Sequence, residues 1–353
     1  MKKVGIGLIG AGMIGQLAHL KNFTSLPNCE VVAIAELRPE LGQQAANRFG
    51  VPKVYANHHE LLADPDVDAV VVVTRRQATG SIVLDALNAG KHVLSEKPMA
   101  HSYAQGQRLV DAAKQSGKLY SVGYMKRHDI GVENAKARIE KFYQSNELGS
   151  IVFLRGYCFG GDIGVSKDGF SMTSEPRPDG LELWPMAPDW LPEEIIEDYA
   201  WFLNVNIHML NLVRYLSNCR PSVRSVDFSQ PNGRSLALDF GSYSGVLEFG
   251  EVAHRDWREG VEIFFEKGTI HVTLPQPLAE GKCAEVHVSD RLPCTLTQTK
   301  QDKQSWAFRR QAETFVQDIL QDRQSITSGG DALADMALAE EIWQLHVSQA
   351  NLV

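Results

Sequence analysis

Three glycines near the start of the chain have the spacing of a phosphate-binding turn. They follow an apolar run, Val4–Ile9, and open a stretch with helical periodicity. Gly10 permits a tight turn, Gly12 lets the backbone approach a pyrophosphate, and Gly15 lets the helix lie close to the sheet with its N-terminus facing the phosphates. We therefore expect dinucleotide contacts from the whole turn, namely Gly10, Gly12, Met13, Ile14 and Gly15.

An acidic residue follows the second predicted strand. Glu36 stands 21 residues after Gly15, where a carboxylate can accept hydrogen bonds from a ribose diol. The same carboxylate repels a 2'-phosphate, so NAD is expected as the cofactor and NADP is less favoured. Arg38 weakens this preference, because its guanidinium can offset the phosphate charge or stack on the adenine.

A glutamate and a lysine come directly after another predicted strand, residues 92–95. In a doubly wound sheet, ligands bind outside the carboxyl ends of the strands, so Glu96 and Lys97 are expected to face the nicotinamide half of a cofactor. Oxidation of a secondary alcohol requires a group that removes the hydroxyl proton, and like charge and burial lower the proton affinity of such a lysine. Lys97 is therefore the first predicted catalytic residue. The alternative is a surface lysine that precedes a helix-starting proline.

Two further groups of polar residues could complete a site. Asn204 and His208 open a predicted helical stretch that ends near residue 216, and their i, i+4 spacing places them on one helix face. Thr74 and Arg75 follow a predicted strand, and Arg76 stands next to them. A guanidinium fork suits phosphate and carboxylate, so the arginines either clamp the pyrophosphate or meet an anionic substrate group. The alternative is solvent exposure with weak surface pairing.

Length and composition limit the class of protein. The chain has 353 residues, 44% of them hydrophobic and 22% charged, which is typical of a folded protein of about two domains. A net charge of −8 argues against general binding of nucleic acid. The longest aliphatic run, residues 69–73, is too short for a membrane span, and five scattered cysteines without a CxxC pair favour a reducing compartment. We expect a cytoplasmic protein, and no metal-ligand motif is present.

The order of predicted elements indicates two domains. In residues 1–123, short β-branched runs alternate with helical stretches at 39 onward, 81–88 and 102–116, which is typical of a doubly wound parallel sheet, an α/β Rossmann domain. In residues 124–353, longer two-periodic strands in series, two closing helices and a helix at 132–144 predict an α+β domain with a large, mostly antiparallel open sheet. Residues 160–198 show no period and are expected to be an ordered loop.

The motifs together resemble one known family. The glycine turn, Glu96-Lys97-Pro98, the segment that contains Tyr124 and Arg127, and the closing helices are similar to glucose-fructose oxidoreductase, inositol dehydrogenase and MocA over essentially the whole chain. The resemblance implies an N-terminal nucleotide domain and a C-terminal sheet whose open face forms oligomers, here a homodimer or homotetramer. It also implies a sugar, cyclitol or related polyol as substrate. Tyr124 and Arg127 are then expected to contact the substrate.

The chain departs from the family pattern at two positions. The family shows Asp-x-x-x-His where this chain has Asn204 and His208, and an amide cannot supply the negative charge that raises the proton affinity of a histidine. His208 is expected to assist or replace Lys97 in proton exchange, while Asn204 orients the reacting hydroxyl. Arg75 and Arg76 replace a Thr-Pro and histidine pattern.

The combined prediction is an NAD-dependent oxidoreductase that acts on a ring hydroxyl or ketone. One alternative is an epimerase or glycosidase that oxidises its sugar transiently and then reduces it again. Another is a non-catalytic dinucleotide-sensing protein of the same fold, which the loss of the family aspartate suggests. Trp184, Trp190 and residues 254–258 are of the types that line sugar sites, although such residues more often serve packing.

Overall fold

The computed structural model describes residues 3–161, 169–230, 232–253, 256–289, 295–297 and 303–350. Its contacts divide the chain into two compact units. The first combines Met1–Tyr124, Ser166–Asp189 and Phe308–Met336, and the second combines Met125–Val165, Trp190–Ala307 and Ala337–Val353. The expected domains of 1–123 and 124–353 were continuous, whereas the first unit also takes in two later segments. His254, Arg255 and Cys294, which the sequence analysis considered, lie outside the described residues.

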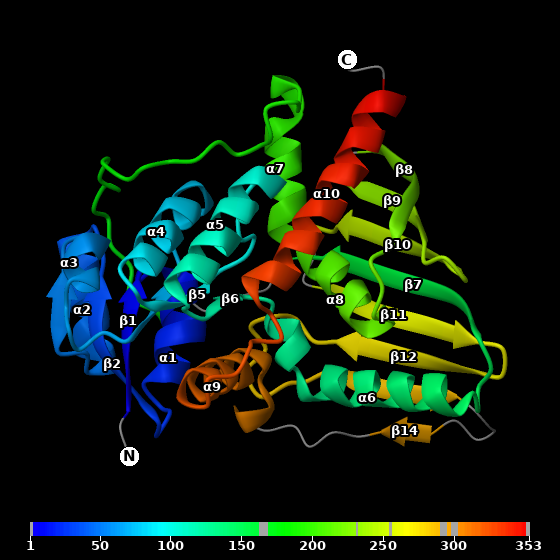
Figure 1. The fold of residues 1–353 in the computed structure, drawn as a ribbon, viewed down its shortest axis with the longest axis horizontal. Coiled ribbons are helices and arrows are strands. Elements are labelled where there is room, and N and C mark those ends of the chain that lie inside the picture. The colour runs from blue at the N-terminus through cyan, green and yellow to red at the C-terminus, as the bar shows by residue number, and fades with distance from the viewer. Residues whose placement is uncertain are drawn as a thin grey trace. The chain divides into compact units, whose positions relative to one another are not determined.

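The first unit is built on a six-stranded parallel sheet, as predicted, in the order β3-β2-β1-β4-β5-β6. Near-continuous apolar runs form these strands because both faces of the sheet are covered. In Figure 1, α4 and α5 lie on one face, and α1 and α9 lie on the other. The strands are β1 (Val4–Ile9), β2 (Cys29–Ala35), β3 (Lys53–Tyr55), β4 (Ala69–Val72), β5 (His92–Ser95) and β6 (Tyr120–Val122).

The helices of the first unit differ from the predictions mainly at their starts. The helix after β4 begins at Arg76 and not near residue 81, because Thr79 and Gly80, which are weak helix formers, are held by burial. The short β3 and the helix after it were not predicted. The helices are η1 (Gly15–Leu20, a π-helix), α1 (Lys21–Phe23), α2 (Pro39–Phe49), α3 (His58–Leu62), α4 (Arg76–Asn88), α5 (Tyr103–Ser116), α9 (Ala307–Leu320) and the start of α10 (Gly329–Gln349).

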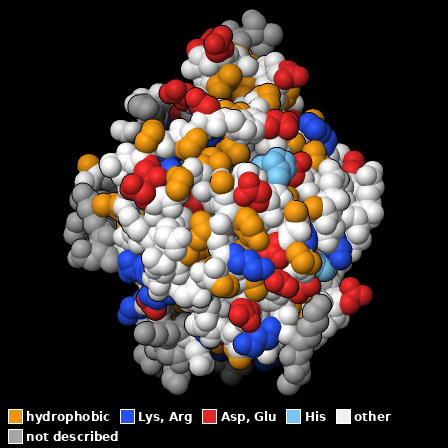
Figure 2. All heavy atoms as spheres, turned by 90° about the vertical axis from the view of Figure 1, so that its left-hand side faces the viewer, with side chains coloured by type: hydrophobic (Ala, Val, Ile, Leu, Met, Phe, Trp, Pro, Cys, Tyr) orange, Lys and Arg blue, Asp and Glu red, His pale blue; other side chains and the backbone are white. Residues whose placement is uncertain are grey.

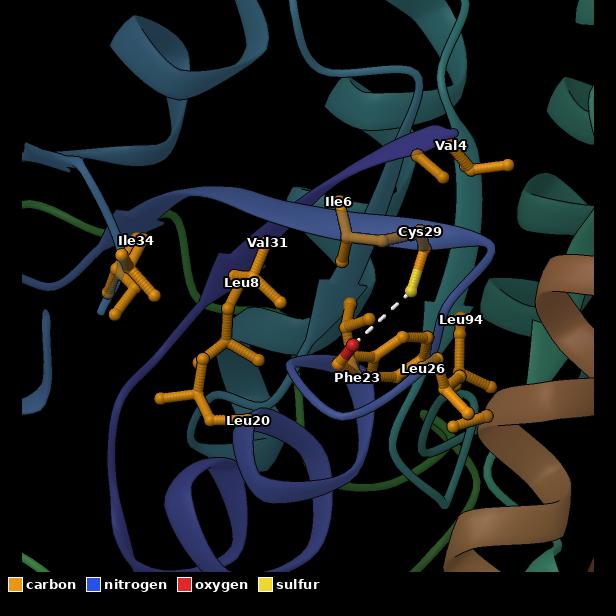
Figure 3. Close-up of a cluster of buried hydrophobic side chains, with 14 of the residues drawn as sticks. Val4, Ile6, Leu8, Leu20, Phe23, Leu26, Cys29, Val31, Ile34 and Leu94 are labelled. Carbon is orange, nitrogen blue, oxygen red and sulfur yellow. Dashed lines mark hydrogen bonds between the residues drawn. The ribbon is translucent and has the colours of Figure 1, made fainter. Parts of the chain in front are cut away.

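The core of the first unit joins residues from both ends of the chain. Side chains of β1 and β2 pack with Leu20 and Phe23, and Phe315 from α9 closes the cluster. Figure 3 shows Cys29 inside this cluster, where its Sγ donates a hydrogen bond to the Phe23 carbonyl oxygen at 3.3 Å. Burial raises the pKa of the Cys29 thiol to about 11, so this thiol stays protonated at neutral pH.

The second unit is built on an eight-stranded sheet in the order β14-β13-β12-β11-β7-β10-β9-β8. Its pairs are antiparallel, as expected, except that β10 runs parallel to β7. Alternate residues of β9 and β10 are buried, which fits the two-residue period of the sequence. The strands are β7 (Ile151–Gly160), β8 (Ser222–Gln230), β9 (Gly233–Asp239), β10 (Ser244–Glu251), β11 (Trp257–Phe265), β12 (Gly268–Leu274), β13 (Glu285–Ser289) and β14 (Thr295–Thr297).

Helices pack on this second sheet. Helix α6 contacts β12 and β13, and helix α8 contacts β7. Both helices are drawn in Figure 1. Residues 196–205 form a separate helix because Tyr199, Phe202 and Leu203 are buried. We had expected a loop up to residue 198 and a helical stretch that opens only at Asn204. The elements are η2 (Met125–His128), α6 (Ile130–Ser145), η4 (Glu193–Ile195), α7 (Ile196–Val205), α8 (Ile207–Ser217), η5 (Lys303–Ser305) and the remainder of α10.

Two general properties follow from the described residues. None of their helices has the length and apolar character that a membrane span requires. Figure 2 shows one face of the molecule, on which acidic and basic side chains are interspersed and no broad patch carries a single sign of charge.

Candidate dinucleotide site

A cavity of about 310 Å³ lies in the first unit at the carboxyl ends of its central strands. Parallel strands meet their ligands at this edge because the loops that follow them converge there. The structure brings nine of the predicted cofactor residues to the wall of this one cavity: Gly10, Gly12, Met13, Ile14, Gly15, Glu36, Arg38, Thr74 and Arg75. Their contact with a cofactor remains a prediction.

The three glycines have different physical reasons to lack a side chain. Gly10 has a φ of +97°, and a Cβ there would lie 2.2 Å from the Val73 carbonyl oxygen. A Cβ on Gly15 would lie 2.3 Å from the carbonyl oxygen of Gly10. A Cβ on Gly12 would meet nothing within 4 Å, so no packing in the chain requires a glycine there. An open position in the glycine turn fits the approach of a ligand such as a pyrophosphate to the backbone.

Glu36, at the end of β2, is oriented by three hydrogen bonds. Its Oε2 accepts from the Ala11 backbone N–H at 2.9 Å, and its Oε1 accepts from the backbone N–H of Arg38 at 3.2 Å and from Arg38 Nε at 2.8 Å. The carboxylate therefore lines the cavity in a fixed position. The Arg38 ion pair balances part of the charge that would repel a 2'-phosphate.

Glu96 and Lys97 follow β5 at the same edge of the sheet. Glu96 Oε1 is 2.9 Å from His19 Nε2, and Glu96 Oε2 accepts from the Lys97 backbone N–H at 3.2 Å. Burial raises the pKa of Glu96, but the hydrogen bond from His19 and the charges of His19 and Lys97 outweigh it, so the pKa lies below its usual value. Glu96 is thus a fixed carboxylate beside the half-buried Lys97, which precedes a cis peptide bond to Pro98.

The remaining predicted residues lie mostly in the second unit. Asn204 is in the last turn of α7 and His208 is in the first turn of α8. The expectation that they lie on one face of a single regular helix is therefore wrong. The helices are separated at Asn206, whose carbonyl oxygen accepts from Met209 and Leu210 and so starts α8. Both predicted side chains are half-buried.

The predicted substrate residues Tyr124 and Arg127 are both buried. Tyr124 is 1% exposed at the end of the first unit, and Arg127 is 4% exposed in η2 of the second. Arg127 Nε donates to Asn211 Oδ1 at 2.7 Å, and its guanidinium lies 4.9 Å from the centre of the Tyr215 ring. These contacts give Arg127 a packing role that the sequence did not indicate. A substrate contact remains a prediction for both residues.

Comparisons with known proteins agree with this architecture. Residues 4–124 match a family described as an oxidoreductase family with an NAD-binding Rossmann fold. The inositol 2-dehydrogenase of Salmonella typhimurium is 33% identical over 153 residues, which cover 42% of this chain and 44% of that protein. The part of the chain over residues 4–124 therefore belongs to the Gfo/Idh/MocA family of oxidoreductases. The aligned region thus spans less than half the length of this relative.

Solved structures of other proteins share the fold over nearly the whole chain. A levoglucosan dehydrogenase in complex with NADH and levoglucosan has a TM-score of 0.76 and 20% sequence identity, and 98% of each chain is covered. A 3-ketoreductase from Actinomadura kijaniata in complex with NADP has a TM-score of 0.74 and 18% identity, with 97% of each chain covered. At these identities the likeness concerns the fold. The family fingerprint supports NAD(P) binding, and these two neighbours hold different cofactors.

Several residues in and around this site were not found from the sequence. His19 contacts Glu96 from η1, and Arg177, Pro178 and Leu181 line the cavity from a segment that we had expected to be a loop. No motif pointed to them, because the residues beside which they lie are far away in the chain.

Among the described residues, one group has potential metal-ligand geometry, formed by His58, His59 and Asp85. His58 Nε2 lies 3.0 Å from Asp85 Oδ2, so a hydrogen bond already accounts for the approach of these two side chains. The sequence did not indicate the group, because Asp85 comes from α4.

Proposed function

We propose that the chain is an NAD-dependent oxidoreductase that transfers a hydride between nicotinamide and a ring hydroxyl or ketone of a sugar, cyclitol or related derivative. The observation that carries the proposal is the cavity in which the open Gly12 position faces the same space as the fixed Glu36 carboxylate. A dinucleotide bound there would supply hydride acceptance and donation, and the protein supplies orientation and proton exchange. Inositol and sugar dehydrogenases among its relatives support the substrate class.

NAD is the proposed cofactor because Glu36 meets the cavity with both carboxylate oxygens in defined positions. A ribose 2'-hydroxyl can donate to such a carboxylate, while a 2'-phosphate brings a like charge. Arg38 reduces this discrimination through its ion pair with Glu36. We therefore expect a preference for NAD that is real but smaller than an unpaired acid would give.

In the proposed chemistry, Lys97 exchanges a proton with the reacting oxygen. His208 assists or replaces Lys97, and Asn204 holds the hydroxyl by donating or accepting a hydrogen bond. Glu96, held by His19, keeps a negative charge beside Lys97.

The test is absorbance of NADH at its near-ultraviolet band while the protein is incubated with NAD and a panel of cyclitols and sugars. Accumulation of NADH supports the dehydrogenase. Product formation without NADH would indicate the second candidate, an epimerase or glycosidase with transient oxidation. If NAD binds but neither NADH nor product forms, the result would favour a dinucleotide-sensing protein. The amide of Asn204 in place of an acid suggests this alternative.

We also propose that the protein is a cytoplasmic homo-oligomer that pairs through the open face of the second sheet. This face carries Arg155, Tyr157, Trp257 and His271 around a hollow. Arg155 forms ion pairs with Glu248 and Glu262 on the two neighbouring strands. Sedimentation velocity of the purified protein tests the oligomeric part of this proposal, and a monomer at micromolar concentration would contradict it.

A further inference from the structure

Residues 169–189, here called the strap, belong to the first unit although they are distant from its sheet in the chain. The strap begins at the glycine turn. The side chain of Gln16 pairs with Ser171 as a backbone would: Gln16 Nε2 donates to the Ser171 carbonyl oxygen at 3.0 Å, and the Ser171 N–H donates to Gln16 Oε1 at 2.8 Å. This pair fixes one end of the strap to the helix that follows β1.

The strap then reaches the helix that follows β2. The Glu175 carboxylate accepts from the backbone N–H groups of Glu40 and Leu41, each at 3.1 Å, in the first turn of α2. Thr173 Oγ1 donates to Glu175 Oε2 at 3.0 Å and holds the carboxylate in place. An anion at a helix start satisfies N–H groups that the helix itself leaves unpaired. Glu175 is therefore a second anchor.

The far end of the strap is fixed to the helix that follows β4. Trp184, 5% exposed, packs against Gly80, where a Cβ would lie 2.3 Å from the indole ring. The Trp184 backbone N–H donates to the Gln77 carbonyl oxygen at 2.8 Å, and Ser81 Oγ donates to the Glu182 backbone carbonyl oxygen at 2.8 Å. Because β2 and β4 flank β1, these anchors carry the strap across the carboxyl ends of all three strands.

Between the anchors, the strap presents Arg177, Pro178 and Leu181 to the cavity that the glycine turn lines. Prolines on both sides of Arg177 restrict its backbone, since a residue before proline is held in extended conformations. Gly180, with a φ of +107°, turns the chain back toward α4. The Arg177 side chain is therefore displayed from a stiff segment.

The charges of the cavity wall favour an anionic occupant near Arg177. The wall carries Glu36, Arg38, Arg75 and Arg177 as its formally charged side chains, apart from His58. Glu36 and Arg38 form an ion pair with each other. Arg75 and Arg177 thus give the cavity wall a net positive charge. Among the described residues, no ion pair involves Arg177.

We propose that the strap closes the adenosine half of the dinucleotide site and that Arg177 binds phosphate charge of the cofactor there. This proposal rests on the proposed function, and it adds a cofactor-binding residue, Arg177, that lies outside the glycine turn. A guanidinium fork can hold two phosphate oxygens, and contacts to a charged group are stronger than neutral hydrogen bonds. Because the strap is anchored on both sides, release of the cofactor requires local movement of residues 176–181.

The first experiment measures binding by titration calorimetry with NAD, NADP and ADP-ribose. Arg177→Ala is expected to weaken NAD and ADP-ribose about tenfold, the loss of one charge-assisted contact. Arg48→Ala, an exposed arginine of α2 that does not line the cavity, serves as the matched control and is expected to bind as the wild type does. Arg177→Lys should recover part of the affinity.

The ligand series identifies the phosphate. An equal loss for NAD and NADP assigns Arg177 to the pyrophosphate, whereas a larger loss for NADP assigns it to the 2'-phosphate. Unchanged affinity for all three ligands in Arg177→Ala would overturn the inference and leave the proposed function intact. If wild-type protein binds none of them, the proposed function itself fails.

A second experiment uses hydrogen–deuterium exchange and needs no turnover. Addition of NAD is expected to slow exchange in peptides that cover residues 176–184 of the wild-type chain, and to slow it less in Arg177→Ala. The peptide that covers α6, in the second unit, is the internal control. Protection confined to the glycine turn, with no change in the strap, would show that the strap does not close on the cofactor.

Discussion

At the scale of single residues, Lys97 is the position on which the proposed chemistry depends most. Lys97→Ala removes the group that exchanges a proton with substrate, and the expected loss in kcat is at least about a hundredfold. NAD affinity should stay within about threefold, because the Lys97 side chain is absent from the described wall of the cavity. Steady-state kinetics and calorimetry on one preparation measure both. Loss of NAD binding would show that Lys97 acts on the cofactor.

Glu36 offers a residue-scale test of cofactor choice. Glu36→Gln keeps the size of the side chain and a hydrogen-bond acceptor but removes the charge, and it leaves the Arg38 guanidinium without its ion pair. The ratio of kcat/KM for NAD over NADP should therefore fall by about tenfold, mostly through a lower KM for NADP. A control variant, Glu30→Gln, changes an exposed acid of the same strand. An unchanged ratio would remove Glu36 from the specificity argument.

The sequence predicted those residues whose roles depend on local spacing. The glycine turn and Glu36 follow a strand-turn-helix pattern of fixed length, so their meeting at one cavity could be anticipated. His19 and Gln16 could not, because their partners, Glu96 and Ser171, come from distant segments. The same holds for Arg127, because its partner Asn211 comes from a distant segment of the chain.

At the scale of elements, periodic strands and helices were predicted well and segments stabilised by tertiary contacts were not. The strap has no repeating pattern, and its order comes from Trp184, Glu175 and Ser171 contacting other elements. Helix α7 was missed because its apolar side chains follow a Pro-rich stretch. The doubly wound, parallel class of the first sheet was predicted, since strands that alternate with helices leave few topologies, but the strand order was not, and the edge strand β3 was missed.

The Trp184 anchor allows an element-scale prediction. Trp184→Ala removes a buried indole and its contact with Gly80, so the strap should exchange amide hydrogens faster and NAD should dissociate faster. Stopped-flow displacement of NAD measures the dissociation rate, which we expect to rise more than the association rate falls. Trp201→Ala, an exposed tryptophan of the second unit, is the control. Equal dissociation rates for wild type and Trp184→Ala would mean that the strap does not limit release.

At the scale of the whole molecule, the first unit depends on residues from the end of the chain. Phe315 of α9 is 2% exposed and its ring meets that of Phe23 edge-on at 6.3 Å. Phe315→Ala should destabilise the protein by about 3–5 kcal/mol, the usual cost of removing a buried aromatic ring. Urea unfolding followed by fluorescence measures the change. A loss below about 1 kcal/mol would indicate that the sheet of the first unit is stable without α9.

Acid should destabilise the folded chain partly through His101, which is 1% exposed. Burial and the nearby positive charge of Arg76 lower the pKa of His101 from 6.5 to about 4. Between these two values the unfolded chain binds a proton that the folded chain does not, so stability falls as the pH drops from 6.5 toward 4. The full effect is on the order of 3 kcal/mol.

His101→Gln removes this titration and should flatten the acid side of the stability curve. Urea midpoints at pH 7 and pH 5 measure the difference, and His59→Gln is the control, because His59 is an exposed histidine of the same unit. His92, His271 and His346 also have pKa values lowered chiefly by burial, so the variant is expected to keep part of the acid sensitivity. Identical midpoint shifts in wild type and His101→Gln would mean that His101 is protonated equally in the folded and unfolded chains, and the burial argument would then fail at this residue.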